Sequence, residues 1–353
     1  MNLLITSSAR RLDVITFFKE AFKSQNVSGE VVVCDSQYNA PSLQVADKSY
    51  VVPEYNDQMY VEALLHICKK EAIKSVFPLN DLEIHLLAEN KNRFHRIGTQ
   101  LLVPDAAVVR KVRDKAAYSD LLTFSNVRTP KTFISMNEVH EALTNGEISY
   151  PLVLKPRNGS ASFGILFARN SDDLYYAYRY VKEEVLQSPL GKEYNIPPEQ
   201  AVVIQEVVDG EKYSVDVIND LHGNYLTTLV RKQLAMRAGD VDRCITVRDR
   251  KLELLGEKIG TTLQHRGYLN TDVYVDEQGP CVIDINPRMG GGYSFSHMSG
   301  ADIPAAITAL LSGGPIQPEW LTHDHQKEFA RYDAVTEINR TNDKSATNIQ
   351  ALS

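Results

Sequence analysis

The segment 281–288 constrains the fold more than any other part of the chain, and it reads Cys-Val-Ile-Asp-Ile-Asn-Pro-Arg. Successive side chains of a strand point to opposite faces, so Asp284 and Asn286 share one face while Ile283 and Ile285 take the other. Two oxygen ligands then stand side by side near a strand end, shortly before Arg288. Oxygen ligands suit Mg²⁺, and Mg²⁺ with arginine suits a transferring phosphoryl group. The simpler interpretation is a strand that ends in a polar Asn-Pro turn.

The composition is typical of a soluble globular protein with two or three domains. The chain has 353 residues, of which 43% are hydrophobic and 24% charged, and its net charge of −7 argues against nucleic-acid and membrane-surface partners. Four scattered cysteines without a C-x-x-C pair favour free thiols over a disulfide framework or a zinc site. The N terminus has no basic leader, and no stretch approaches the roughly 18 apolar residues of a membrane helix. We therefore expect a cytoplasmic protein.

The first hundred residues alternate short apolar strands with amphipathic helices. Expected strands at 3–5, 30–34 and 75–79 are separated by helical spacing of apolar residues. This βαβ order predicts a parallel sheet of Rossmann type. The segment 7–11 stands where a dinucleotide fold carries its glycines, but it contains no G-x-G-x-x-G. A nicotinamide or flavin site is therefore poorly supported.

The later part of the chain has an antiparallel pattern. Strands are expected at 202–207, 213–218, 225–231, 272–275 and 281–285, with a helix near 250–264. An apolar helix is expected at 302–312, and a last strand within 328–338, before a polar tail.

A loop of small residues follows the predicted strand at 152–155. Lys155 ends that strand, and the loop reads Pro-Arg-Asn-Gly-Ser-Ala-Ser-Phe-Gly from 156 to 164. Such a loop can fold its N–H groups over phosphates and can close as a lid. It lacks the residue order of a P-loop, and a flexible hairpin turn is an equal alternative.

Two further segments suggest a nucleotide. The strand ending at Gln205 and Glu206, before an Asp-Gly turn, offers a donor, an acceptor and apolar walls that suit adenine. A β-hairpin with polar ends is the alternative. Lys115 lies early on a predicted helix beside Asp114, where a solvated lysine is the usual finding.

Asp272 precedes Asp284 by 12 residues, which is the spacing of a hairpin. The two carboxylates share a face only if the loop has an odd length or a strand carries a bulge. A three-residue loop at 277–279, with Gly279 at positive φ, satisfies this condition. Asp272, Asp284 and Asn286 would then converge, and two divalent ions there could bridge phosphate oxygens.

Taken in order, Lys115, the Lys155 loop, the Gln205-Glu206 hinge and Asp284-x-Asn286-x-Arg288 resemble the ATP-grasp superfamily. The resemblance is closest to its carbamoyl-phosphate-synthase-like and carboxylate–amine ligase branch. It implies an α/β Rossmann-like pre-ATP-grasp domain at 1–105, followed by an α+β ATP-grasp domain with antiparallel sheets at 106–325. A lid subdomain would span about 125–208, and 326–353 would hold a final strand and the tail.

The resemblance also implies residue roles. Arg288 and Lys155 would be catalytic, and ATP would be bound with Mg²⁺, or Mn²⁺ in its place. The implied ATP-binding residues are Lys115, Lys155, Gly159, Ser160, Ala161, Ser162, Gly164, Gln205, Glu206, Val207, Val208 and Glu211. The implied metal ligands are Asp272, Asp284 and Asn286.

The chain departs from the family pattern at two places. Both acidic metal positions carry the shorter aspartate where the family usually has glutamate, or glutamine at the first. The ribose-binding glutamate commonly stands immediately before the aromatic residue that follows the hinge glycine. Lys212 holds that place in this chain, and Glu211 stands one residue earlier.

Four residues are candidates for binding the second substrate. Arg231, Lys232 and Arg237 could bind a carboxylate, although a solvated strand end is an equal alternative. His297 could face the acceptor, but a lone histidine is more often structural.

The resemblance implies ATP-dependent joining of a small carboxylate to an amine through an acyl phosphate, with release of ADP and phosphate. Two alternatives remain open: single-unit phosphorylation of bicarbonate or carbamate, as in carbamoyl phosphate synthases, and a non-catalytic ATP-binding regulatory subunit. A homodimer is compatible with the family. The sequence identifies neither the two substrates nor the base that deprotonates the amine.

Overall fold

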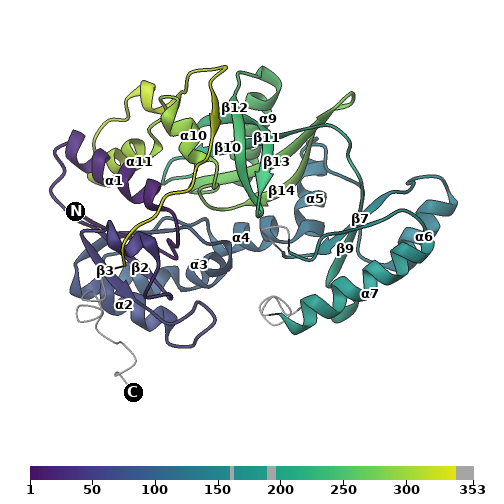
Figure 1. Cartoon of the computed structure of the whole chain (residues 1–353), viewed down its shortest axis with the longest axis horizontal. Helices are drawn as coiled ribbons and strands as arrows, with labels where there is room; N and C mark the ends of the chain where they lie inside the picture. The colour runs from purple at the N-terminus through teal and green to yellow at the C-terminus, as the bar shows by residue number, and fades with distance from the viewer. Residues whose placement is uncertain (160–162, 189–195, 339–353) are drawn as a thin grey trace.

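Three β-sheets organise the described residues, one with five strands, one with six and one with four (Figure 1). The computed structural model describes residues 1–159, 163–188 and 196–338, so the predicted contacts Ser160, Ala161 and Ser162 lie outside the described residues. The predicted fold class is confirmed, because a parallel α/β sheet is followed by antiparallel sheets. In the part of the chain that is described, no helix combines the length and apolarity needed to cross a bilayer.

The five-stranded sheet is parallel throughout and runs in the order β3-β2-β1-β4-β5. Its strands are β1 (Asn2–Thr6), β2 (Val31–Asp35), β3 (Lys48–Val51), β4 (Ile73–Pro78) and β5 (Gln100–Leu101). The helices are α1 (Leu12–Ser24), α2 (Tyr60–Lys70) and α3 (Asp81–Arg96), with a 3₁₀ turn at Pro41–Gln44. Strand order reverses between β1 and β4, and ligands of such sheets bind in the crevice outside that point.

Two short helices, α4 (Ala106–Arg113) and α5 (Lys115–Phe124), follow this sheet. The helix predicted here is broken at Asp114, because the Asp114 carboxylate accepts hydrogen bonds from the N–H groups of Ala116 and Ala117 and so starts α5. Lys115 is therefore the first residue of α5, and it is buried.

The four-stranded sheet forms a separate layer on the right of Figure 1, with α6 and α7 alongside it. The order is β6-β9-β7-β8, and all neighbours are antiparallel. The elements are β6 (Thr132–Phe133), α6 (Met136–Thr144), β7 (Leu152–Pro156), β8 (Leu166–Ala168), α7 (Ser171–Gln187), a 3₁₀ turn (Pro198–Gln200) and β9 (Val202–Glu206). Its core joins Leu152, Leu154 and Ile204 to Leu174 and Val181 of α7.

The six-stranded antiparallel sheet has the order β14-β13-β10-β11-β12-β15. Its strands are β10 (Glu211–Asn219), β11 (Tyr225–Arg237), β12 (Asp240–Thr246), β13 (Gly267–Asp276), β14 (Gly279–Asn286) and β15 (Glu328–Ala330), and the helices nearby are α9 (Arg250–Leu263), α10 (Tyr293–Met298) and α11 (Ile303–Ser312), before a 3₁₀ turn (Pro318–Leu321). The helix α9 covers the apolar face, where Val215, Val217 and Leu269 are buried with Leu252 and Ile259. Strand β15 stops at Ala330, so the strand predicted within 328–338 is shorter than the pattern suggested.

The hairpin of β13 and β14 corrects the predicted loop. Asp276 pairs with Gly279, so the turn has two residues rather than the predicted three, with Gly279 at φ +102°. Asp272 pairs with Asp284, while the next pair joins Val273 to Val282, so Ile283 is the extra residue of a bulge. The bulge, not the loop length, therefore brings the two carboxylates to one face.

The buried face of the six-stranded sheet generates a stability prediction. Leu269→Ala should lower the free energy of unfolding by about 2–5 kcal/mol, because Leu269 is fully buried and its loss leaves a cavity. Leu254→Ala, on the exposed side of α9, should change it by less than about 0.5 kcal/mol. Urea denaturation followed by circular dichroism compares them, and equal losses would contradict the assignment of this face to the core.

Candidate functional site

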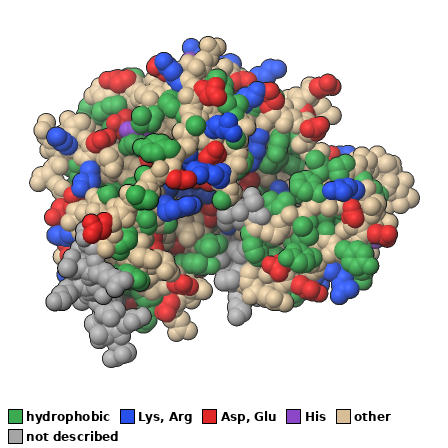
Figure 2. Space-filling model, in the orientation of Figure 1, with side chains coloured by type: hydrophobic (Ala, Val, Ile, Leu, Met, Phe, Trp, Pro, Cys, Tyr) green, Lys and Arg blue, Asp and Glu red, His purple; other side chains and the backbone are tan. Residues whose placement is uncertain are grey.

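A cavity of about 500 Å³ lies where the three sheets meet. Its walls come from the loops after β1 and β4, from the polar face of the six-stranded sheet and from the loop after β7. Figure 2 shows lysine and arginine side chains gathered with carboxylates in a hollow at the centre of the view. A volume of this size is typical of small-molecule sites.

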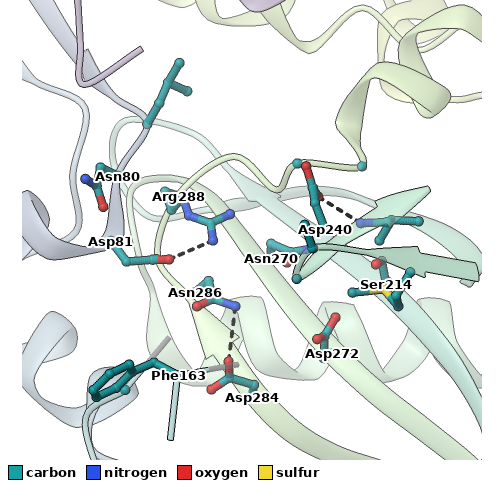
Figure 3. Close-up of a pocket in the computed structure, with 18 of the residues that line it drawn as sticks. Asn80, Asp81, Phe163, Ser214, Asp240, Asn270, Asp272, Asp284, Asn286 and Arg288 are labelled. Atoms are coloured by element: carbon teal, nitrogen blue, oxygen red, sulfur yellow. Dashed lines mark hydrogen bonds and ion pairs between the residues drawn. The ribbon is translucent and has the colours of Figure 1, made fainter. Parts of the chain in front are cut away.

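The β13–β14 hairpin supplies the oxygen atoms of the cavity wall. Asp272 lies opposite Asp284, and Asn270 lies opposite Asn286, so these four side chains occupy one face. All four line the cavity, and Figure 3 shows Asp272, Asp284 and Asn286 on adjacent strands. The amide of Asn286 donates to Asp284 Oδ2 at 3.4 Å.

Two lysines approach the hairpin from different elements. Lys115 Nζ lies 3.0 Å from Asp284 Oδ1 and donates to the carbonyl oxygen of Gly159 at 2.7 Å. Lys155 Nζ, from the end of β7, donates to the carbonyl oxygen of the bulge residue Ile283 at 3.3 Å. Both lysines are buried, line the cavity and lie beside the same carboxylate.

Burial and neighbouring charge tune these groups. Loss of hydration and the nearby Lys115 ammonium lower the pKa of Lys155 to about 8. Loss of hydration opposes the ionisation of Asp284, but the charges of Lys115, Lys155 and Arg113 outweigh it, and its pKa falls to about 2. Asp284 is therefore a full anion at neutral pH, while Lys155 can exchange its proton near pH 8.

Arg288 lines the cavity on the side of Asn286 that is away from Asp284 (Figure 3). Its Nη2 donates to Asp81 Oδ2 at 2.7 Å, as the dashed line in Figure 3 marks. Asp81 is the first residue of α3, and Arg113 Nη1 lies 3.9 Å from its other oxygen. This contact fixes the guanidinium at the edge of the N-terminal sheet.

Asp272 is held by two nitrogen donors. Lys212 Nζ lies 3.0 Å from Asp272 Oδ2, and Gln233 Nε2 donates to Asp272 Oδ1 at 3.0 Å. Gln233 also donates to Ser214 Oγ at 2.8 Å. Lys212, Ser214 and Gln233 all line the cavity, on β10 and β11.

The donor set for a metal ion is uneven across the hairpin. Asn286 Oδ1 is buried without a hydrogen-bond partner, beside Asp284, so an acceptor is available there. No group of three or more His, Cys, Asp or Glu side chains arranged for a metal occurs within the described ranges. An oxygen-ligand site at Asp284 and Asn286, completed by a ligand's own oxygens, fits these residues.

The predicted lid and hinge residues belong to the four-stranded sheet and to the loops that follow β7 and β9. Gly159 lines the cavity, and its backbone and that of Gly164 pack against Pro156 so closely that an added Cβ would come within 2.9 and 3.1 Å of that ring. Glu206 N–H donates to the carbonyl oxygen of Lys131 at 3.3 Å. Among the described residues that line the cavity, Gly164, Gln205, Glu206, Val207 and Val208 are not found.

The remaining candidates pair with residues outside the cavity lining. Glu211, with an exposed side chain, accepts a hydrogen bond from Lys232, and buried Arg231 pairs with Asp216. Arg237 binds Asp242 and Asp333 at 2.9 and 2.8 Å. His297 stacks on Phe17 with ring centres 3.6 Å apart. Their predicted roles in binding ribose or substrate stay predictions without a contact to the cavity.

Sequence reasoning missed several residues of the cavity wall. Asp81 follows a predicted strand of the N-terminal sheet, and strand ends at a reversal point are the signal that could have found it. Ser214, Gln233 and Asn270 occupy alternate positions on strands, where polar residues on one face are the only signal.

Comparisons with known proteins agree with this architecture. Protein y4rH of Sinorhizobium fredii is 28% identical over 199 residues, covering 53% of this chain and 38% of that protein. A formate-dependent phosphoribosylglycinamide formyltransferase of Prochlorococcus marinus is 29% identical over 165 residues, covering 46% of this chain and 39% of the enzyme. The chain thus spans about two fifths of the length of these curated relatives.

A solved structure shows the same fold. The biotin carboxylase domain of 2-oxoglutarate carboxylase from Hydrogenobacter thermophilus superposes with a TM-score of 0.73 at 16% identity, covering 92% of this chain and 72% of that one. That domain was solved as a dimer in complex with MgADP, ADP and bicarbonate.

Two family models match the chain, the PylC-like N-terminal domain at residues 3–102 and the ATP-grasp domain at residues 112–292. The second match covers half of the chain and includes the hairpin, the three cavity lysines Lys115, Lys155 and Lys212, and Arg288. The predicted recognition is therefore confirmed, and this chain belongs to the ATP-grasp family.

Proposed function

We propose that this protein is an ATP-dependent ligase that joins a small carboxylate to an amine and releases ADP and phosphate. One observation carries the proposal: a single cavity holds Asp272 and Asp284 on one sheet face, Lys115 and Lys155 beside them, and Arg288 across from them. Cations around a carboxylate pair suit a triphosphate with a bound metal.

Each part of the cavity then has a task. The ammonium groups of Lys115 and Lys155 would contact the phosphates, with the segment 156–164 as the lid. The predicted metal set of Asp272, Asp284 and Asn286 would hold Mg²⁺, or Mn²⁺, whose charge would stabilise phosphoryl oxygens when bound. Adenine would bind at the hinge at the end of β9, in the four-stranded sheet. This hinge consists of Gln205, Glu206, Val207 and Val208.

The chemistry consists of two displacements. A carboxylate oxygen attacks the γ-phosphorus in line, the bond to the ADP oxygen breaks, and an acyl phosphate forms. The amine nitrogen then attacks the acyl carbon, phosphate leaves and the nitrogen loses a proton as the amide forms. Arg288 would stabilise charge on the transferred group, and Lys155 would do so from the other side, so catalysis depends on positioning and electrostatics.

The relatives support the choice of reaction class. The name of the Prochlorococcus enzyme specifies formate, a carboxylate, and the Hydrogenobacter domain binds bicarbonate and MgADP. Residues 1–105 as the pre-ATP-grasp domain, 106–325 as the ATP-grasp domain and 326–353 as the final segment belong to the same proposal. So do a cytoplasmic location, which four buried free cysteines suit, and a homodimer.

The proposal is tested by screening pairs of carboxylates and amines for release of ADP and phosphate. Turnover that requires both partners, with an amide found by mass spectrometry, is the expected result. Nucleotide binding without consumption by any pair would instead indicate a regulatory subunit. Consumption with bicarbonate alone would indicate carbamoyl-phosphate-type chemistry.

Arg288 provides a direct prediction. Arg288→Ala should keep ATP affinity within roughly tenfold but lower kcat on the order of a hundredfold, because the guanidinium would act on charge that develops during transfer. Calorimetry measures affinity, and coupled ADP release measures turnover. Arg93→Ala, which removes a surface arginine of α3 paired with Glu62, is the matched control and should leave both unchanged. Lost binding with normal residual turnover would refute the assigned role.

Lys155 provides a second prediction. Its neutral fraction should reach half near pH 8, so competitive acetylation followed by mass spectrometry should show a reactivity midpoint at that pH. A bound triphosphate stabilises the charged form, so saturating ATP analogue should move the midpoint upward by at least about one unit. Lys48 serves as the internal control, because the hydrogen bonds that its ammonium donates to Glu30 and Glu71 raise its pKa. A midpoint unmoved by nucleotide would place the phosphates elsewhere.

A further inference from the structure

On the cavity face of the β13–β14 hairpin, Asp272 and Asp284 are contacted by different lysines, Lys212 and Lys115. We propose that the Lys212 ammonium takes the place of a second divalent ion at Asp272, so that this protein works with one metal ion, held at Asp284 and Asn286. This inference rests on the proposed function, which supplies the triphosphate. It departs from the two-ion arrangement that the sequence suggested, and it removes Asp272 from the metal ligands named in the proposed function.

The contacts of Asp272 leave no oxygen without a donor. Lys212 Nζ lies 3.0 Å from Oδ2, and Gln233 Nε2 donates to Oδ1 at 3.0 Å. Gln233 is held in turn by Ser214 Oγ at 2.8 Å. A divalent ion bound to this carboxylate would lie next to the Lys212 ammonium, and the repulsion between the two cations is strong in a partly buried site.

Strand register makes the position of Lys212 a fixed feature. Ser214 pairs with Asp272 across β10 and β13, and Lys212 is two residues from Ser214, so its side chain lies diagonal to Asp272 on the same face. The acidic Glu211 belongs to the opposite face and accepts from Lys232 and from the Tyr213 hydroxyl. The cavity face therefore carries the Lys212 ammonium at this position. The acidic Glu211, one residue earlier on the same strand, points to the opposite face.

The other half of the face keeps an acceptor for a metal. Lys115 Nζ lies 3.0 Å from Oδ1 of Asp284, and the contact of Oδ2 with the Asn286 amide is long, at 3.4 Å. Asn286 Oδ1 is buried and has no hydrogen-bond partner. The Lys115 ammonium can leave Asp284 for a phosphate oxygen and keep its hydrogen bond to the Gly159 carbonyl oxygen, at 2.7 Å. One ion with two protein ligands fits here.

A fixed ammonium neutralises phosphate charge without depending on the metal concentration. The enzyme would then need only the ion that accompanies the nucleotide, and free Mg²⁺ beyond that amount would not raise its rate. Lys212 would act as a binding residue for the triphosphate, at the place where a bridging ion would otherwise contact it.

The test counts metal ions directly. Mn²⁺ is titrated into the protein saturated with a non-hydrolysable ATP analogue, and electron paramagnetic resonance of free Mn²⁺ gives the number bound per chain. We expect one Mn²⁺ for the natural protein and two for Lys212→Met, because the variant frees Asp272. Lys212→Arg keeps a cation and should bind one, and Lys48→Met, which removes an ion-paired strand lysine outside the cavity, should also bind one.

The outcomes separate this inference from the proposed function. Two Mn²⁺ ions in the natural protein, or one in Lys212→Met, would overturn the inference while leaving the ligase proposal intact. Failure of the natural protein to bind the analogue would instead remove the proposed function itself. If Lys212→Met does not fold, as circular dichroism would show, the count for the natural protein still decides whether it binds one ion or two, and two would overturn the inference.

Discussion

The register of the β13–β14 hairpin is the constraint on which the cavity depends. Side chains of a strand change face at every residue, so a slip of one position would exchange Asp284 and Asn286 for Ile285. Because the turn has two residues, one residue of β14 has no partner on β13. This residue is Ile283, and it forms the bulge. The bulge also turns the Ile283 carbonyl oxygen toward Lys155 and the Tyr118 hydroxyl, which donate to it at 3.3 and 2.6 Å. One backbone irregularity thus sets both the carboxylates and a lysine.

The charges of the cavity satisfy one another before any ligand enters. Lys115 lies on Asp284, Lys212 on Asp272 and Arg288 on Asp81, so no carboxylate of this group is left without a cation. Removing one member would leave a partly buried charge uncompensated, which costs more than the pair itself contributes. The proposed triphosphate could enter such a site by exchange, since its oxygens would offer Lys115 a new anionic partner while the metal ion would bind Asp284.

How far the sequence predicts the structure depends on the range of each contact. Alternation along one strand is local, so the shared face of Asp284 and Asn286 could be predicted, as could the parallel sheet from its βαβ order. The bulge could not be chosen over a longer loop, because both give the same spacing between Asp272 and Asp284. Gln233 of β11 donates to Asp272 of β13 across the strand β10 that lies between them. No local sequence pattern encodes this order of strands. The stacking of His297 on Phe17 is likewise a contact between distant helices.

The salt bridge between Arg288 and Asp81 would give the N-terminal sheet a part in the proposed chemistry. Asp81 begins α3 behind an Asn80–Glu83 capping box, so its position is fixed by the end of β4 and not by the ATP-grasp sheet. The guanidinium proposed to act on the transferred phosphoryl group is therefore oriented by the domain whose β1 and β4 loops line the far side of the cavity. Any change in how the two sheets sit would move Arg288 relative to Asp284. A ligand bound at those loops would consequently be coupled to the alignment of the arginine through one carboxylate.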